Sequence, residues 1–154
     1  MTSMTIKAAA FLCAVAATAS AGIAGEITVK DAFALSSGKM TKAGAAFVTL
    51  ENQTGSDDRL IDVASDAAVR VELHTHKRTS DNVMKMIHVK EGFALPKDGM
   101  LHMKRGGNHI MFMGLTEPWE DGGTLSVTLV FEKAGEVEID IPVDLKKAAE
   151  KHSH

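Results

Sequence analysis

Residues Arg70–Leu115 read RVELHTHKRTSDNVMKMIHVKEGFALPKDGMLHMKRGGNHIMFMGL, and both the predicted sheet and the chemistry of the chain depend on this stretch. Its alternating apolar and polar side chains predict β-strands, since successive residues of a strand point to opposite faces. It also holds five histidines and six methionines; beyond the first 24 residues, the rest of the chain has only Met40, His152 and His154. Imidazole and thioether groups bind metals, and thioether favours the soft ion Cu(I).

One face of the predicted strands collects these nitrogen and sulfur donors. Leu73, Ile110 and Phe112 point to the opposite face, where they would form core. A single methionine in a strand is usually packed in the core, so no single residue predicts a metal site. The metal site is predicted from the histidines and methionines taken together. Periodicity does not choose between Met84 and Met86, or between Met111 and Met113. The grouped donors are His74 with His76, Met84 with Met86 and His88, and His109 with Met111 and Met113.

The donor set favours monovalent copper over zinc. Zinc in proteins favours thiolate or carboxylate beside histidine, and no acidic residue stands in the His109-x-Met111 stretch. Neutral ligands leave the charge of the metal uncompensated, which favours a monovalent ion. Cys13 is the only cysteine, and it lies in the predicted leader. The mature chain therefore lacks the thiolate of the His/His/Cys blue-copper centre and of cysteine-based zinc sites.

Short strands separated by turn residues are predicted along the whole chain, and they indicate an antiparallel β-sandwich or barrel. No long segment has helical periodicity, and residues 144–151 form either a short helix or a frayed end. The formal net charge of -3 argues against a nucleic-acid surface. The predicted strands are 26–30, 44–51, 59–63, 68–75, 83–89, 100–104, 110–113, 123–132 and 136–143.

The first 24 residues read as a secretory signal peptide. Lys7 precedes the apolar run AAAFLCAVAATA, and small residues allow cleavage after Ala21 or Ala24. The run is too short to span a bilayer comfortably, which disfavours an uncleaved anchor. Cys13 lies inside the run and not at its end, which disfavours a lipoprotein signal. We therefore predict an exported protein with one domain over residues 25–147 and a short tail over 148–154.

These motifs resemble the periplasmic copper chaperones of the PCu(A)C family. The family motif is a histidine, an optional methionine, a gap of ten, a methionine, a gap of about twenty-one, then His-x-Met. Here His74 opens the motif, Thr75 stands where the optional methionine would be, and Met86 follows after ten residues. His109-x-Met111 closes it after twenty-two residues, one more than usual. The resemblance extends to AGAAFVTLEN, AVRVELH, GGNHIMFMGL and TLSVTLVFEKAGEVEIDIPV.

The resemblance implies a cupredoxin-like, antiparallel Greek-key β-sandwich or barrel that is a soluble periplasmic carrier and not an enzyme. The implied Cu(I) ligands are His74, Met86, His109 and Met111. The implied acceptor is the CuA centre of cytochrome c oxidase, in subunit II, or a thiol-bearing chaperone. Some family members hold Cu(II) in a tail rich in histidine and methionine. Here His152 and His154 could form a weak secondary site or be solvent-facing histidines.

Other interpretations remain open at this point. A copper store or scavenger would use several low-affinity sites built from the Met and His groups. For the carrier, His76 and Met113 are candidate spare or supporting ligands. A copper oxidase or hydrolase is disfavoured because no acid, base or nucleophile stands beside the predicted site. A plain sandwich domain for protein contacts predicts no metal selectivity at all.

Overall fold

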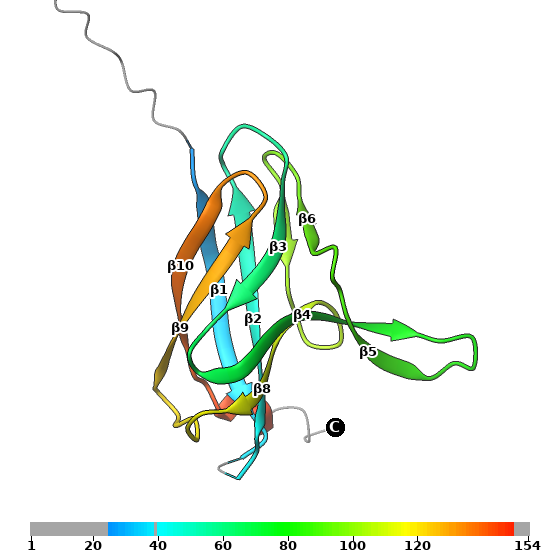
Figure 1. The fold of residues 1–154 in the computed structure, drawn as a ribbon, viewed down its shortest axis with the longest axis vertical. Coiled ribbons are helices and arrows are strands. Elements are labelled where there is room, and N and C mark those ends of the chain that lie inside the picture. The colour runs from blue at the N-terminus through cyan, green and yellow to red at the C-terminus, as the bar shows by residue number, and fades with distance from the viewer. Residues whose placement is uncertain (1–24, 39, 150–154) are drawn as a thin grey trace, which may run out of the picture.

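The chain forms a two-layered β-sandwich, seen in a computed structural model that describes residues 25–38 and 40–149 (Figure 1). The predicted leader and residues 150–154 of the predicted tail lie outside the described residues. The predicted all-β class is confirmed, and α1 is a single four-residue helix. The elements are β1 (Ile27–Ser36), β2 (Ala43–Asn52), β3 (Asp58–Ala64), β4 (Ala68–Arg78), β5 (Met84–His88), β6 (Phe93–Leu95), β7 (Met100–His102), β8 (His109–Leu115), β9 (Thr124–Phe131), β10 (Gly135–Pro142) and α1 (Lys146–Ala149).

Two antiparallel sheets make up the sandwich. The first sheet has the strand order β1-β2-β8-β4-β5, with β7 pairing β2, and the second has the order β10-β9-β3-β6. Strands that follow one another in the chain often lie in different sheets, for example β2 and β3 or β5 and β6. The sandwich therefore closes around one core through crossing connections, as in the predicted Greek-key arrangement.

The core lies between the sheets and follows the predicted alternation. Leu50, Ile110 and Phe112 from the first sheet and Leu60 and Leu129 from the second are fully buried. In β2 buried residues alternate with partly exposed ones, except that Phe47, between Ala46 and Val48, is also buried. Burial of these side chains stabilises the fold by about 1.5–3 kcal/mol each.

Two local features fix the ends of the sandwich. The buried amide of Asn52 donates to the carbonyl oxygens of Ser56 and Leu95, at 2.8 and 3.0 Å, and its oxygen accepts from the backbone N–H of Thr54. The amide thereby provides hydrogen-bond partners for backbone groups of the turn that follows β2. At the other end, a Cβ on Gly44 would lie 2.4 Å from the indole ring of Trp119, so only glycine allows this ring to cover β2.

Apart from β1 and β6, the predicted strand boundaries lie within three residues of the observed ones, and β4 continues to Arg78, past its predicted end at residue 75. The predicted short strand 26–30 is the first part of β1, which continues to Ser36 past an irregularity between Val29 and Asp31. The strand β6 was not predicted, because three residues are too few to establish a period. The predicted 144–151 segment is helical over Lys146–Ala149.

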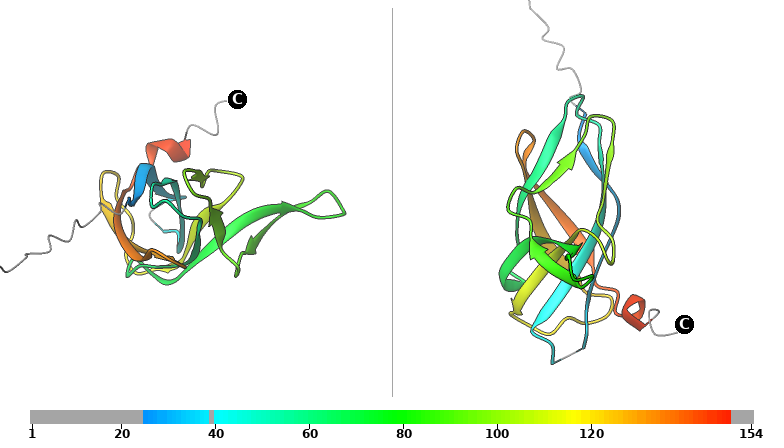
Figure 2. Two further views of the ribbon diagram at one scale, coloured as in Figure 1. Left: turned by 90° about the horizontal axis from the view of Figure 1, so that it is seen from above. Right: turned by 90° about the vertical axis from the view of Figure 1, so that its right-hand side faces the viewer.

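The outer part of β4 and all of β5 form a hairpin that leaves the body of the sandwich, here called the β4–β5 arm (residues 76–88) (Figures 1 and 2). Strand β8 pairs with β4 only as far as His74, whereas β5 pairs with β4 from His74 to Arg78. Beyond His74, β4 therefore has β5 as its only neighbouring strand in the described chain. The tip is closed by hydrogen bonds from Thr79 N to Val83 O at 2.8 Å and from Arg78 Nη1 to Asn82 Oδ1 at 2.6 Å.

Within residues 25–38 and 40–149, no helix is both long enough and apolar enough to cross a membrane.

Candidate metal centre

Three adjacent strands, β8, β4 and β5, bring the predicted ligands to the outer face of the first sheet. His109, His74 and His88 lie in one row across these strands, since His74 pairs with His109 on one side and with His88 on the other. The next row pairs His76 with Met86, and the row on the other side pairs Glu72 with Met111. Directly paired residues share a face, so these side chains form one cluster.

The imidazole rings of the cluster are close to one another. The ring centroids of His74 and His109 are 6.0 Å apart, and those of His74 and His88 are 5.7 Å apart. The shortest separation is 5.2 Å, between His76 and His109. The pair predicted as ligands, His74 and His109, is therefore brought together, and His76 lies closer to His109 than His74 does.

His109 is the buried member of the cluster, with 1% of its surface exposed. Its ring packs beside Phe47, at a centroid distance of 6.1 Å. Its Nδ1 lies 2.9 Å from the carbonyl oxygen of Gly107, and its Nε2 is buried with no partner. Burial lowers the pKa of His109, and His76 and His74 add to this, although the Gly107 carbonyl opposes it. The ring is therefore neutral at pH 7, the form that binds metals.

His74 is held by an acidic neighbour on its own strand. Its Nε2 lies 2.8 Å from Oε2 of Glu72, while its Nδ1 is buried and has no partner. The hydrogen bond with His74 lowers the pKa of Glu72, and the nearby His88 and Arg70 favour the ionised form further. An ionised carboxylate beside a histidine ring is the usual support for a metal-binding imidazole.

His76 was predicted only as a spare or supporting ligand. Its Nδ1 is buried and unpartnered, as are His74 Nδ1 and His109 Nε2, and its side chain lies directly across from Met86. Three of the buried side-chain atoms without a hydrogen-bond partner in the described chain are thus imidazole nitrogens of this one cluster. An unpaired buried polar atom costs about 1–3 kcal/mol, so three in one place indicate a missing partner. Sequence periodicity had already placed His76 with His74, but it could not show that the two rings reach His109.

Strand register distinguishes Met84 from Met86 and Met111 from Met113, which periodicity could not do. Met86 lies across from His76, whereas Met84 lies across from Arg78 at the far end of the arm. Met111 is two residues from His109 and lies across from Glu72, whereas Met113 lies across from Arg70. Register therefore favours Met86 and Met111 as the sulfur donors next to the imidazoles. Their role as ligands stays a prediction.

Other histidines and methionines lie apart from the cluster. Met103 is buried in the core, and β7, which carries Met100 and His102, pairs with β2 and not with β4 or β5. Met86 is 44% exposed on the edge strand β5, so the cluster is open to solvent on this side. In the described ranges, no three His, Cys, Asp or Glu side chains are grouped so that they could hold a metal ion.

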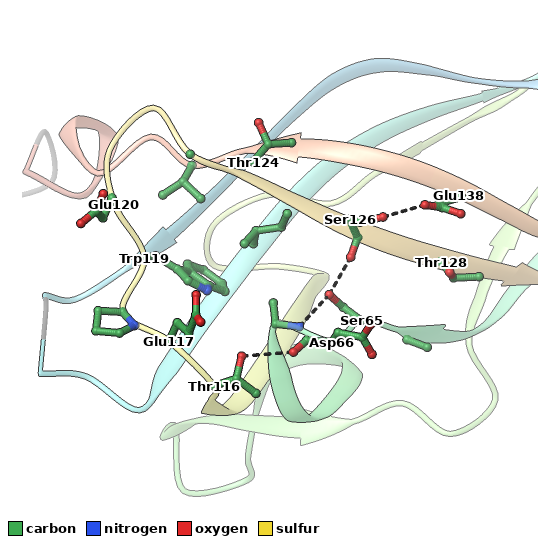
Figure 3. Close-up of a pocket in the computed structure, with 16 residues that line it drawn as sticks. Ser65, Asp66, Thr116, Glu117, Trp119, Glu120, Thr124, Ser126, Thr128 and Glu138 are labelled. Atoms are coloured by element: carbon green, nitrogen blue, oxygen red, sulfur yellow. Dashed lines mark hydrogen bonds between the residues drawn. The ribbon is translucent and has the colours of Figure 1, made fainter.

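A hollow of about 1020 Å³ lies at the other end of β4 and β8, next to the Ala68–Leu115 pair (Figure 3). Ala68 lies six residues before His74 on β4, which corresponds to about 20 Å along a strand. Trp119 and carboxylates such as Glu117 line the hollow, and no histidine or methionine does. Several of its polar groups bond one another, as Ser126 Oγ does with Glu138 at 2.8 Å. The hollow offers no soft ligand.

A family model described as "Putative lipoprotein LpqE-like" matches residues 27–143. A relative from Leifsonia xyli subsp. xyli, "Putative lipoprotein Lxx21020", is 35% identical over 99 residues, which are 64% of this chain and 59% of the relative. The matched part of the chain thus spans about three fifths of that relative.

Solved structures similar to this chain include PCuAC domains and the protein DR1885. The copper-bound PCuAC domain from PmoF2 is 25% identical with a TM-score of 0.63, covering 79% of this chain and 95% of that domain. Apo-DR1885 from Deinococcus radiodurans is 25% identical with a TM-score of 0.61, covering 93% and 95%. The CuI form of DR1885 is 26% identical with a TM-score of 0.58, covering 83% of each chain. The predicted fold class is thereby confirmed.

Proposed function

The chain belongs to the LpqE-like family and has the fold of PCuAC domains, and on this premise we propose that it carries Cu(I) and hands it to another protein. Two relatives of the same fold are described as copper-bound or as a CuI form. The proposed ligands are His74, Met86, His109 and Met111.

The observation that supports this proposal most directly is the gathering of unpartnered imidazole nitrogens beside methionines on one sheet face. His74 Nδ1 and His109 Nε2 are both buried without a partner, and their residues are directly paired across β4 and β8. Two imidazoles and two thioethers form a neutral, soft ligand set, which suits Cu(I) better than Zn(II) or Cu(II). The lowered pKa of His109 keeps its nitrogen available at neutral pH.

Transfer would proceed by ligand exchange at the open side of the site. Met86 is 44% exposed and lies on the edge strand β5, whereas His109 is only 1% exposed. An incoming donor from the acceptor can displace the flexible Met86 thioether first, while the buried histidine still holds the ion. The acceptor we propose is the CuA centre of cytochrome c oxidase or a thiol-bearing chaperone, with the exchange taking place in the periplasm after export.

A Cu(I) titration against a competing chelator tests the proposal. The wild-type chain should bind one Cu(I) tightly, and His109→Ala and Met111→Ala should each lose tight binding. Thermal unfolding of the apo forms checks that the variants fold. If both variants bound Cu(I) as tightly as the wild type, the ligand assignment would be wrong.

The alternative function, a copper store, is favoured by the exposed methionines that lie outside the cluster. Met84 and Met100 are 47% and 42% exposed, and neither is needed for the proposed site. A store predicts three or more bound copper ions per chain, whereas a carrier predicts one. The same titration, followed to saturation and combined with metal analysis, distinguishes the two functions.

A further inference from the structure

His74 and His109 differ in the ring nitrogen that is left without a hydrogen-bond partner, which is Nδ1 in His74 and Nε2 in His109. A neutral imidazole has one nitrogen that donates a hydrogen and one that accepts, so the partner of one nitrogen decides what the other can do. The two rings have different partners, and each partner is an acceptor only. The protonated nitrogen of each ring is therefore fixed by its surroundings.

In His74 the fixed partner is the carboxylate of Glu72. The Nε2 to Oε2 distance is 2.8 Å, and an ionised carboxylate can only accept, so Nε2 carries the hydrogen. The lone pair is then on Nδ1, which is buried and unpartnered. Glu72 itself has little freedom, because its carboxylate also lies 3.6 Å from His88 Nδ1 and 3.7 Å from Arg70 Nη1. Its side chain is 19% exposed.

In His109 the fixed partner is the backbone carbonyl of Gly107. The Nδ1 to oxygen distance is 2.9 Å, so Nδ1 carries the hydrogen and Nε2 has the lone pair. Nε2 is buried and unpartnered. The two rings meet at 63° with their centroids 6.0 Å apart. His109 thus offers the nitrogen far from its backbone, whereas His74 offers the nitrogen next to its Cγ atom.

We propose that Glu72 is a positioning residue of the copper site: it holds His74 in the tautomer that binds copper through Nδ1, while the Gly107 carbonyl holds His109 to bind through Nε2. This inference rests on the proposed function. The family motif begins at His74 and does not include Glu72, whose role follows from its contacts. Glu72 acts through His74 and is not itself a ligand.

The tautomer can be measured in the apo protein, independently of copper. Long-range ¹H–¹⁵N spectra of histidine-labelled protein above pH 8 should show His74 protonated at Nε2 and not at Nδ1. Glu72→Gln should keep this tautomer, because the amide oxygen still accepts the hydrogen bond. Glu72→Ala should give a mixture of tautomers at His74 and leave His109 unchanged.

Copper binding then tests which nitrogen of each ring binds Cu(I) and whether Glu72 affects the affinity. In the diamagnetic Cu(I) form, the ¹⁵N shift of Nδ1 should change for His74 and that of Nε2 for His109. Glu72→Ala should weaken Cu(I) binding by about 10–100-fold, the usual effect of losing a residue that supports a ligand. Glu72→Gln should bind nearly as tightly as the wild type. The matched control is Glu51→Ala, which removes a carboxylate on β2 of the same sheet that pairs with Lys30 and, among the described residues, has no ion pair with a histidine.

Three outcomes would overturn the proposal. The first is wild-type protein that binds Cu(I) tightly with His74 bound through Nε2. The second is an unchanged tautomer and affinity in Glu72→Ala. The third is a loss in Glu72→Gln as large as in Glu72→Ala, which would make the carboxylate charge, or direct ligation by Glu72, the cause. Wild-type protein that binds no Cu(I) would overturn the proposed function itself.

Discussion

The β4–β5 arm and the β9–β10 hairpin are both antiparallel hairpins, but they differ in burial and in the side chains that they carry. Strand β9 buries alternate residues and lies between β10 and β3, whereas all five residues of β5 are exposed and β5 pairs with β4 alone. Residues 124–142 contain no histidine or methionine, while the arm carries three of the clustered donors, His76, Met86 and His88. The hairpin that stabilises the sandwich is thus separate from the one that carries the chemistry.

The charges of the two hairpins differ in the same way. The charged side chains of the arm are Lys77, Arg78 and Lys85 against Asp81 alone. Between residues 124 and 142, Lys133 is the only basic residue, and four of the residues are acidic. Local stability is lowest where few apolar side chains are buried, so the arm can move and exchange ligands while the core stays intact. The following variants, from the largest expected effect to the smallest, test this separation.

Leu129→Ala should have the largest effect on stability. Leu129 is fully buried on β9, and its truncation should lower the free energy of unfolding by about 2–5 kcal/mol. Ile87→Ala on β5, where the side chain is 39% exposed, should change it by no more than about 0.5 kcal/mol. Denaturant unfolding measures both. Equal losses would mean that the arm contributes to the core as much as β9 does.

Asp58→Asn should lower the free energy of unfolding by about 1–3 kcal/mol at pH 7. The carboxylate of Asp58 on β3 accepts from the backbone N–H groups of Lys133 and Ala134, each at 2.9 Å, and so holds the β9–β10 turn. The asparagine would direct an N–H group at one of these donors. Asp62→Asn on the same strand is the control, since within the described part of the chain the Asp62 carboxylate accepts only from the backbone N–H of its neighbour Val63. Similar losses in the two variants would show that the turn does not depend on Asp58.

The effect of Asp58→Asn should depend on pH. Burial by itself raises the pKa of Asp58, but the backbone N–H groups of Lys133, Arg59 and Ala134 outweigh it and hold the pKa below its ordinary value. A lowered folded pKa means that the stabilisation is complete above about pH 4 and is lost as the pH falls through the folded value. The difference between wild type and variant should therefore shrink at pH 3. A constant difference would contradict this.

Met86→Ala should weaken Cu(I) binding by about tenfold or more, equivalent to about 1.4 kcal/mol, and speed its release. Met84→Ala should leave both unchanged. The two side chains are similarly exposed, at 44% and 47%, and differ mainly in that Met86 lies across from His76. Competition titration and stopped-flow transfer to a chelator measure affinity and release. The reverse order of effects would assign the sulfur ligand to Met84.

Lys85→Glu should have the smallest effect and should stabilise the arm. Lys77 and Lys85 are directly paired across β4 and β5, and like charges in this position repel. The substitution creates an opposite-charge pair, which should contribute about 0.2–1 kcal/mol. Native-state hydrogen exchange of the arm amides should slow, while that of β9 amides stays the same. Faster exchange in the arm would show that Lys85 has a stabilising contact.

Much of the fold followed from residue pattern alone, because alternation reports which face of a strand is buried. Strands β2 and β3 were predicted to within one residue at each end, as were β9 and β10, whereas β4 extends three residues past its predicted end at residue 75. Strand β6 was missed because Phe93–Leu95 is too short to have a period. The inward faces of β4 and β8, with Leu73, Ile110 and Phe112, were also predicted correctly.

The sequence by itself determined the all-β class, the thiol-free set of imidazole and thioether donors and the residues that share a strand face. Only the tertiary structure decided which donors meet, because pairing between strands depends on register and not on spacing along the chain. Register placed His74 across from His109 and His76 across from Met86. Strand β8 begins at His109, and the ring centroid of His76 lies 5.2 Å from that of His109. The conformation of the folded chain also places Glu72 beside His74 and the Gly107 carbonyl beside His109, each two residues away in sequence, and these hydrogen bonds choose the nitrogen that each ring presents.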